Sequence, residues 1–245
     1  MFSLFFAPLE DVISNHGMNC MMYADDTQIY VSINSCSDRS AVLSKLELCV
    51  KDILIWCASN GLSCNADETE VIHITSRYAK RRDPFLGITV GDAVIAPKLT
   101  VRDLVVTVDS HLQFTEHVNS ICRSVYLATS NIGKIQKHLA QDDCKRSVHA
   151  FITSKLDSCN SILYGLPACQ LENLQRVQNT AARLVTREGK FEHISPILHK
   201  LANWLPVKDR IDFKLLLTTF KALHGHAPIY ISENLKPYRP SRSCT

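Results

Sequence analysis

The fold of this chain is decided by residues 23–30, which read YADDTQIY. A short apolar run at Cys20–Tyr23 precedes the acidic pair, and a second run rich in β-forming residues follows at Ile29–Ile33. Two such runs around a tight polar turn predict a β-hairpin. The adjacent carboxylates of Asp25 and Asp26 repel each other and resist burial unless a cation compensates them. They are therefore candidate Mg²⁺ ligands, and the alternative explanation is a solvated acidic turn.

Helix and strand patterns continue beyond this hairpin. Apolar residues from Val42 to Trp56 recur at steps of four and three, which predicts a helix with one buried stripe. Gly61 suits the left-handed end of that helix. Short strands are predicted at Val71–Ile74, at Ile88–Val90 with Ala93–Ile95 around the turn Gly91-Asp92, and at Leu104–Val108.

From Thr115 onward the periodicity is helical, with apolar stripes over residues 118–135, 143–156, 171–184 and 208–224. Gly133 is the weak point of the first of these helices. The sequence therefore predicts an α+β protein in which a mixed front half, residues 1–113, precedes an all-helical back half, residues 114–245.

The composition of the chain is that of an ordinary globular protein. Its 245 residues are 46% apolar and 21% charged, which excludes a disordered tail, a collagen-like chain and a coiled-coil rod. No apolar stretch is long enough for a membrane span, so we expect no membrane partner and an intracellular location. The ten cysteines include no Cys-x-x-Cys pair and mostly fall on apolar faces. We expect them to act as small hydrophobic residues without disulfide partners.

Charge is distributed unevenly along the chain. Residues 1–114 hold nine Lys and Arg against fourteen Asp and Glu, whereas residues 115–245 hold eighteen against ten. A basic second half indicates a polyanionic partner such as nucleic acid. Arg123, Lys134 and Lys137 follow one another at spacings of eleven and three, which predicts that they share one helix face. That face either contacts phosphates or is simply the solvated side of an amphipathic helix.

Residues 23–30 resemble the metal-binding hairpin of reverse transcriptases, and the surrounding pattern resembles the LINE-type, jockey-like branch of non-LTR retrotransposons. The resemblance covers nearly the whole chain in order. The further segments that resemble this family are Trp56–Leu62 with Asn65–Glu70 (the next palm motif), Leu104–Ser110 (the link from palm to thumb), and Leu174–Asn179, Trp204–Val207 and Ala227-Pro228 (helices after the thumb).

The resemblance implies a partial polymerase palm over residues 1–113, made of a hairpin, a helix and short antiparallel strands. An all-α thumb and C-terminal helical region would follow over residues 114–245. The family reaction is RNA-templated DNA synthesis by two-metal nucleotidyl transfer. It implies Mg²⁺ as cofactor, and an RNA template, a DNA primer and deoxynucleoside triphosphates as partners. Asp25 and Asp26 would be the catalytic metal ligands, with Tyr23 near the primer end, and both nucleus and cytoplasm remain open as locations.

Three departures from the family pattern qualify this expectation. The family has a further catalytic Asp, a pocket motif and finger motifs upstream of the hairpin, and none of them precedes Cys20 here. Glu68 stands where the family usually has Lys, and Val105 where it usually has Gly. We therefore expect a fragment that is inactive alone. The alternatives are a non-catalytic nucleic-acid-binding module and a decayed retroelement reading frame without selected function.

Overall fold

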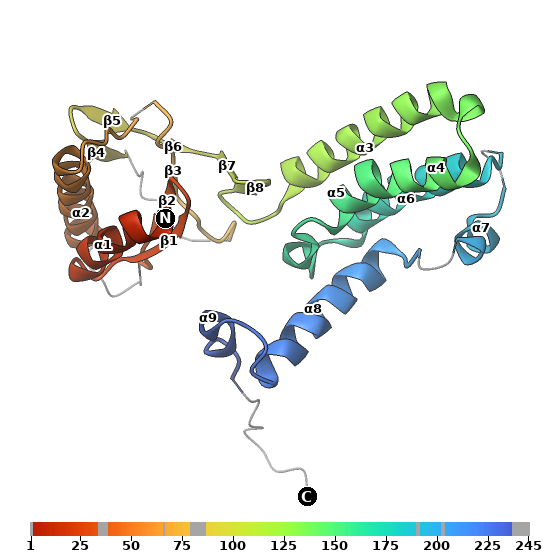
Figure 1. The fold of residues 1–245 in the computed structure, drawn as a ribbon. Helices are drawn as coiled ribbons and strands as arrows, with labels where there is room; N and C mark the ends of the chain where they lie inside the picture. Colours follow the sequence, from red (N-terminus) through yellow and green to blue (C-terminus); the bar gives the residue numbers. More distant parts are fainter. Residues whose placement is uncertain are drawn as a thin grey trace, which may run out of the picture. The chain divides into compact units, whose positions relative to one another are not determined.

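The computed structural model describes residues 2–33, 39–65, 67–78, 87–189, 192–201 and 204–236. Figure 1 shows a mixed α/β chain in which helices predominate and the strands form small pairs. The predicted mixture of helices and short antiparallel strand pairs is confirmed. The chain divides into two compact units: Met1–Asp103 with Val108–Leu112, and Leu104–Thr107 with Gln113–Thr245.

The first unit combines two helices with four strand pairs. β1–β2 and β4–β5 are antiparallel hairpins, β3 and β6 pair in parallel, and β7 pairs with β8. The elements are α1 (Phe2–Asn15), β1 (Asn19–Tyr23), β2 (Asp26–Tyr30), α2 (Arg39–Ser59), β3 (Val71–Ile72), β4 (Ile88–Val90), β5 (Ala93–Ile95), β6 (Pro97–Lys98), β7 (Thr100–Asp103) and β8 (Val106–Asp109).

The long helix α2 organises the first unit. Its apolar stripe, with Cys49 and Ile53 buried, packs on Leu9 and Ile13 of α1 in one hydrophobic cluster. The helix ends as predicted at Gly61, whose φ is +72°. The Gly61 N–H donates to the Ala58 carbonyl and the Leu62 N–H to the Cys57 carbonyl, which is the Schellman arrangement.

The predicted strand Leu104–Val108 is wrong at its beginning. Leu104 has a φ of +51° and forms the turn with Val105, so that β8 begins only at Val106. The left-handed conformation therefore lies at Leu104 and not at Val105, where the family usually has Gly. Apolar residues at an exposed turn are indistinguishable by pattern from strand residues, and this explains the error.

The second unit is helical. α3 packs against α4 and α6 (Figure 1). The core between these helices includes Val125, Leu174 and Val177. The predicted helix over 143–156 consists of α4 and α5 joined by a π-helical turn. The elements are α3 (Thr115–Ile135), η1 (Gln136–His138), α4 (Gln141–Val148), η2 (His149–Thr153), α5 (Ser154–Asp157), η3 (Asn160–Leu163), α6 (Ala168–Thr186), α7 (Ile194–Lys200), α8 (Val207–Leu223) and α9 (Ile229–Ser232).

Gly133 lies inside α3, where glycine lowers the stability of a helix, and the packing around it does not require glycine. A Cβ at this position would lie 3.6 Å from Leu184 Cδ1, an ordinary van der Waals contact. We expect Gly133→Ala to raise the free energy of unfolding by about 0.5–1 kcal/mol, measured by urea denaturation. Gly165→Ala is the control, because Gly165 has a φ of +80° and alanine there should destabilise by about 1 kcal/mol. A lower stability of Gly133→Ala would contradict this reading of α3.

Candidate functional site

The acidic pair lies at the tip of the β1–β2 hairpin, as predicted. The cross-strand partners closest to the turn are Tyr23 and Asp26, so the connection consists of Ala24 and Asp25 alone. Ala24 takes a φ of +55°, which a two-residue hairpin turn demands and which alanine adopts at a cost of about 1 kcal/mol. The second strand of the hairpin thus begins at Asp26, three residues before the predicted β-rich run at Ile29–Ile33.

The two faces of the hairpin differ in exposure. Cys20, Met22 and Ile29 pack on the core of the first unit. The opposite face carries Tyr23, which is 65% exposed, and Asp26 directly across from it. Asp25 and Asp26 are both exposed. Because side chains alternate between the two faces of a strand, the Asp26 carboxylate and the Tyr23 ring lie next to each other on the exposed face of the hairpin.

The same face holds a third carboxylate that the sequence did not indicate. Gln28 Nε2 donates a hydrogen bond to Asp103 Oδ1, which brings the end of β7 against β2. Gln28 lies two residues beyond Asp26 on the same face. The interaction could not be predicted because the β7 strand itself was not recognised.

Asp25 and Asp26 can hold part of a magnesium site. Neither carboxylate has a hydrogen bond or ion pair to another described residue. Mg²⁺ is commonly bound through one or two carboxylates together with waters and substrate phosphates, so this pair suits one hydrated ion. Within the described ranges no three His, Cys, Asp or Glu side chains gather into a ligand group.

Glu68 lies in a tight turn of the first unit. Its N–H donates to the Asn65 carbonyl at 3.3 Å, and the Asp67 N–H donates to Asn65 Oδ1 at 3.1 Å. The Glu68 side chain is exposed. No contact between Glu68 and the acidic tip is present among the described residues.

The three predicted cations are exposed on the second unit, but they do not all lie on one helix. Arg123 and Lys134 belong to α3, whereas Lys137 follows it in the 3-10 turn η1. The prediction of a single helix face is wrong in this respect, because α3 ends at Ile135. Arg123 Nη2 lies 3.8 Å from Glu116 Oε2, and Lys134 Nζ lies 3.4 Å from Asn131 Oδ1. Whether this surface contacts nucleic acid stays a prediction.

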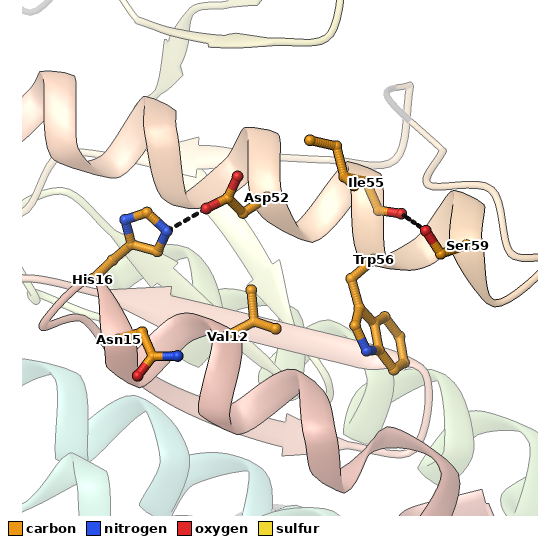
Figure 2. A pocket seen from close by; sticks show the side chains of 7 residues that line it. All are labelled: Val12, Asn15, His16, Asp52, Ile55, Trp56 and Ser59. Atoms are coloured by element: carbon orange, nitrogen blue, oxygen red, sulfur yellow. Dashed lines mark hydrogen bonds and ion pairs between the residues drawn. The ribbon is translucent and has the colours of Figure 1, made fainter.

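A shallow pocket of about 400 Å³ lies between α1 and α2 (Figure 2). His16 Nε2 is 2.8 Å from Asp52 Oδ2 at one end of it. Ser59 Oγ donates to the Ile55 carbonyl at the opposite end of the pocket from His16 (Figure 2). The pocket therefore contains a histidine–carboxylate pair without an aligned nucleophile. The residues that line it are Val12, Asn15, His16, Asp52, Ile55, Trp56 and Ser59.

His117 is a buried histidine at the start of α3. It is 6% exposed, and its Nδ1 accepts the Thr107 N–H at 3.4 Å. Burial lowers the pKa of His117 below its usual value of 6.5. The unfolded chain therefore binds a proton at a pH where folded His117 remains neutral.

Stability should consequently fall as the pH decreases from about 6.5 toward the lowered pKa of His117. The slope from this group is at most about 1.4 kcal/mol per pH unit. The measurement is urea unfolding at several pH values, with His117→Gln as the comparison because glutamine keeps an acceptor and does not titrate. Equal pH slopes for the two chains would contradict this assignment.

The eight described cysteines are free thiols, three of them exposed: Cys64, Cys159 and Cys169. Within the described residues no helix is long and apolar enough to cross a membrane.

Comparison with protein families, curated proteins and solved structures finds no match for this chain.

Proposed function

We propose that this chain is a C-terminal portion of a LINE-type reverse transcriptase, with residues 1–113 from the palm and 114–245 from the thumb and the helices after it. The observation that supports the proposal best is the hairpin tip. An exposed Tyr-Ala-Asp-Asp turn holds two carboxylates that have no partner among the described residues. Such a turn suits a cation that also binds phosphate oxygens.

In this proposal Asp25 and Asp26 bind Mg²⁺, and Tyr23 lies beside the primer end. The bound ion would supply charge neutralisation at the phosphates of the incoming nucleotide. The residues of the chain would hold this ion in place. The pairing of β1 with β2 fixes the spacing of the two carboxylates, and the hairpin is anchored by the packing of Cys20, Met22 and Ile29 on the core.

We propose further that the chain does not polymerise by itself. The tip itself carries the two carboxylates of Asp25 and Asp26, and the third carboxylate on this face, Asp103, accepts a hydrogen bond from Gln28, whereas the family reaction requires ligands on both sides of the ion pair. Glu68 would add negative charge beside a polyanionic product, which opposes catalysis.

Manganese titration followed by NMR tests the metal site. Mn²⁺ is expected to broaden the amide signals of β1–β2 with a weak, millimolar Kd, and Asp25→Asn should abolish the broadening. Asp92→Asn is the matched control, because Asp92 also lies at an exposed hairpin turn and should leave the β1–β2 broadening unchanged. Broadening that persists in Asp25→Asn would sink the proposed metal ligands.

Primer extension tests the loss of activity. The full chain is incubated with Mg²⁺, deoxynucleoside triphosphates and a DNA primer annealed to an RNA template, and no extension is expected. Template-dependent extension that disappears in Asp25→Asn would instead show that the chain polymerises by itself.

The second candidate is a nucleic-acid-binding module without catalysis, favoured by the exposure of Arg123, Lys134 and Lys137. Replacing all three by glutamine should weaken binding to an RNA–DNA duplex tenfold or more, and should reduce the salt slope by up to about three. The measurement is fluorescence anisotropy at several salt concentrations. The three replacements should not change Mn²⁺ binding at the hairpin tip, so this experiment tests the nucleic-acid-binding function independently of the metal site.

The control for this charge removal lies on α8. Lys208, Lys214 and Lys221 are also exposed, and replacing them by glutamine removes the same net charge from the same unit. Equal losses of affinity for the two triple variants would show that binding follows total charge and not the Arg123–Lys137 surface.

A further inference from the structure

We propose that Cys57 and Cys64 form a redox-sensitive thiol pair, which a peroxide converts reversibly into an intramolecular disulfide. The inference does not depend on the proposed function. It rests on the geometry of the end of α2 and on the difference in exposure between the two thiols.

The two sulfur atoms are already in contact. Cys64 Sγ donates a hydrogen bond to Cys57 Sγ across 3.4 Å. A disulfide bond is about 2 Å long, so the sulfurs need to approach by only a little more than 1 Å. Among the described cysteines no other pair has a sulfur–sulfur hydrogen bond.

The helix end holds the thiols in this arrangement. Cys57 lies in the last turns of α2, and its carbonyl accepts the Leu62 N–H at 2.8 Å. The reversal at Gly61 then returns the chain so that Cys64 meets the side chain of Cys57. Residues 62–65 are neither helix nor strand, so Cys64 can move toward Cys57 without breaking a regular element.

The two thiols have different environments. Cys57 is 6% exposed, and burial, with the Cys64 hydrogen bond as the second cause, raises the pKa of Cys57 to about 11. Cys64 is exposed. Cys64 is therefore the thiol that a dissolved oxidant reaches first, and Cys57 is the resolving thiol held against it.

The oxidation balances with hydrogen peroxide as the oxidant. The Cys64 sulfur attacks one peroxide oxygen, the O–O bond breaks, and the departing hydroxide takes the thiol proton to form water. Cys57 Sγ then attacks the sulfur of the Cys64 sulfenic acid, the S–O bond breaks, and a second water leaves with the Cys57 proton. The two thiols lose two electrons, which reduce the peroxide, and a dithiol reductant reverses the bond.

Mass spectrometry of the full chain tests the pair directly. Trypsin releases residues 52–77 as one peptide, and its only cysteines are Cys57 and Cys64. After peroxide treatment and alkylation in denaturant, we expect this peptide to be lighter by two hydrogens and to carry no alkyl group. Titratable thiols should fall from ten to eight, and dithiothreitol should restore both.

Two controls decide between a structured pair and chance oxidation. Cys64→Ser should abolish the bridged peptide, while Cys159 and Cys169, which are exposed, should remain available for alkylation. The bridged peptide should also form about tenfold more in the folded chain than in guanidinium, because the helix end holds the sulfurs together. Equal yields in both states, or scrambled disulfides among all cysteines, would overturn the proposal.

Discussion

Replacing Gln178 by alanine is expected to lower the free energy of unfolding of the second unit by about 3 kcal/mol. Gln178 lies in α6 and is 2% exposed. Its Nε2 donates to the Leu205 carbonyl at 2.8 Å, and its Oε1 accepts from Gln175 Nε2 at 2.9 Å. Alanine would remove one of the two hydrogen bonds that the Leu205 carbonyl and the Gln175 side-chain amide each make, and would leave a cavity at a buried position.

The effect should be large because these bonds continue across the unit. Gln175 Oε1 accepts the Val207 N–H at 2.8 Å, so the glutamine pair connects α6 to the first residue of α8. Removing one member of a buried polar network costs more than losing an isolated hydrogen bond, since two neighbouring groups each lose one of their hydrogen bonds at once.

Urea denaturation of the full chain measures the change. Gln141→Ala is the control, because Gln141 is exposed at the start of α4 and its replacement should stay within about 0.5 kcal/mol of the parent chain. A Gln178→Ala chain as stable as this control would show that the network contributes nothing.

Gln178 also shows where prediction from the sequence ends. Periodicity correctly indicated that Leu174 and Val177 face the core, because apolar residues at helical spacing have few alternatives. A glutamine is usually exposed, and the carbonyl that accepts its hydrogen bond lies 27 residues away. No local pattern contains that information, so the contact between Leu174–Asn179 and Trp204–Val207 emerged only from the structure.

In the candidate site, too, the sequence predicts the local features but not the contacts between distant residues. The hairpin and its acidic tip followed from two β-rich runs and a polar turn, which are local signals. The contact of Asp103 with Gln28 joins residues 75 positions apart, and the thiol pair depends on how the chain turns after Gly61. The sequence predicts Lys137 on the same helix as Lys134 because no stop signal marks the end of α3 at Ile135.

Gly87→Ala is the second substitution with a large expected effect, a loss of about 3 kcal/mol or more in the stability of the β4–β5 hairpin. Gly87 has a φ of +124°, and a Cβ there would lie 2.3 Å from the Ile95 carbonyl oxygen. Because that oxygen belongs to the backbone, the clash cannot be relieved by a side-chain rotation. The strand pair must separate at Ile88 and Ile95, where its register begins.

Hydrogen exchange measures this local loss, since the amides of β4 and β5 should lose protection while those of α6 keep theirs. Gly91→Ala is the matched control in the same hairpin. Gly91 also has a positive φ, +61°, but a Cβ there would meet only Leu54 Cδ1, at 3.9 Å. It should therefore cost about 1 kcal/mol, the price of the left-handed conformation alone. The difference between the two variants isolates the backbone clash, and equal effects would refute the close approach at Gly87.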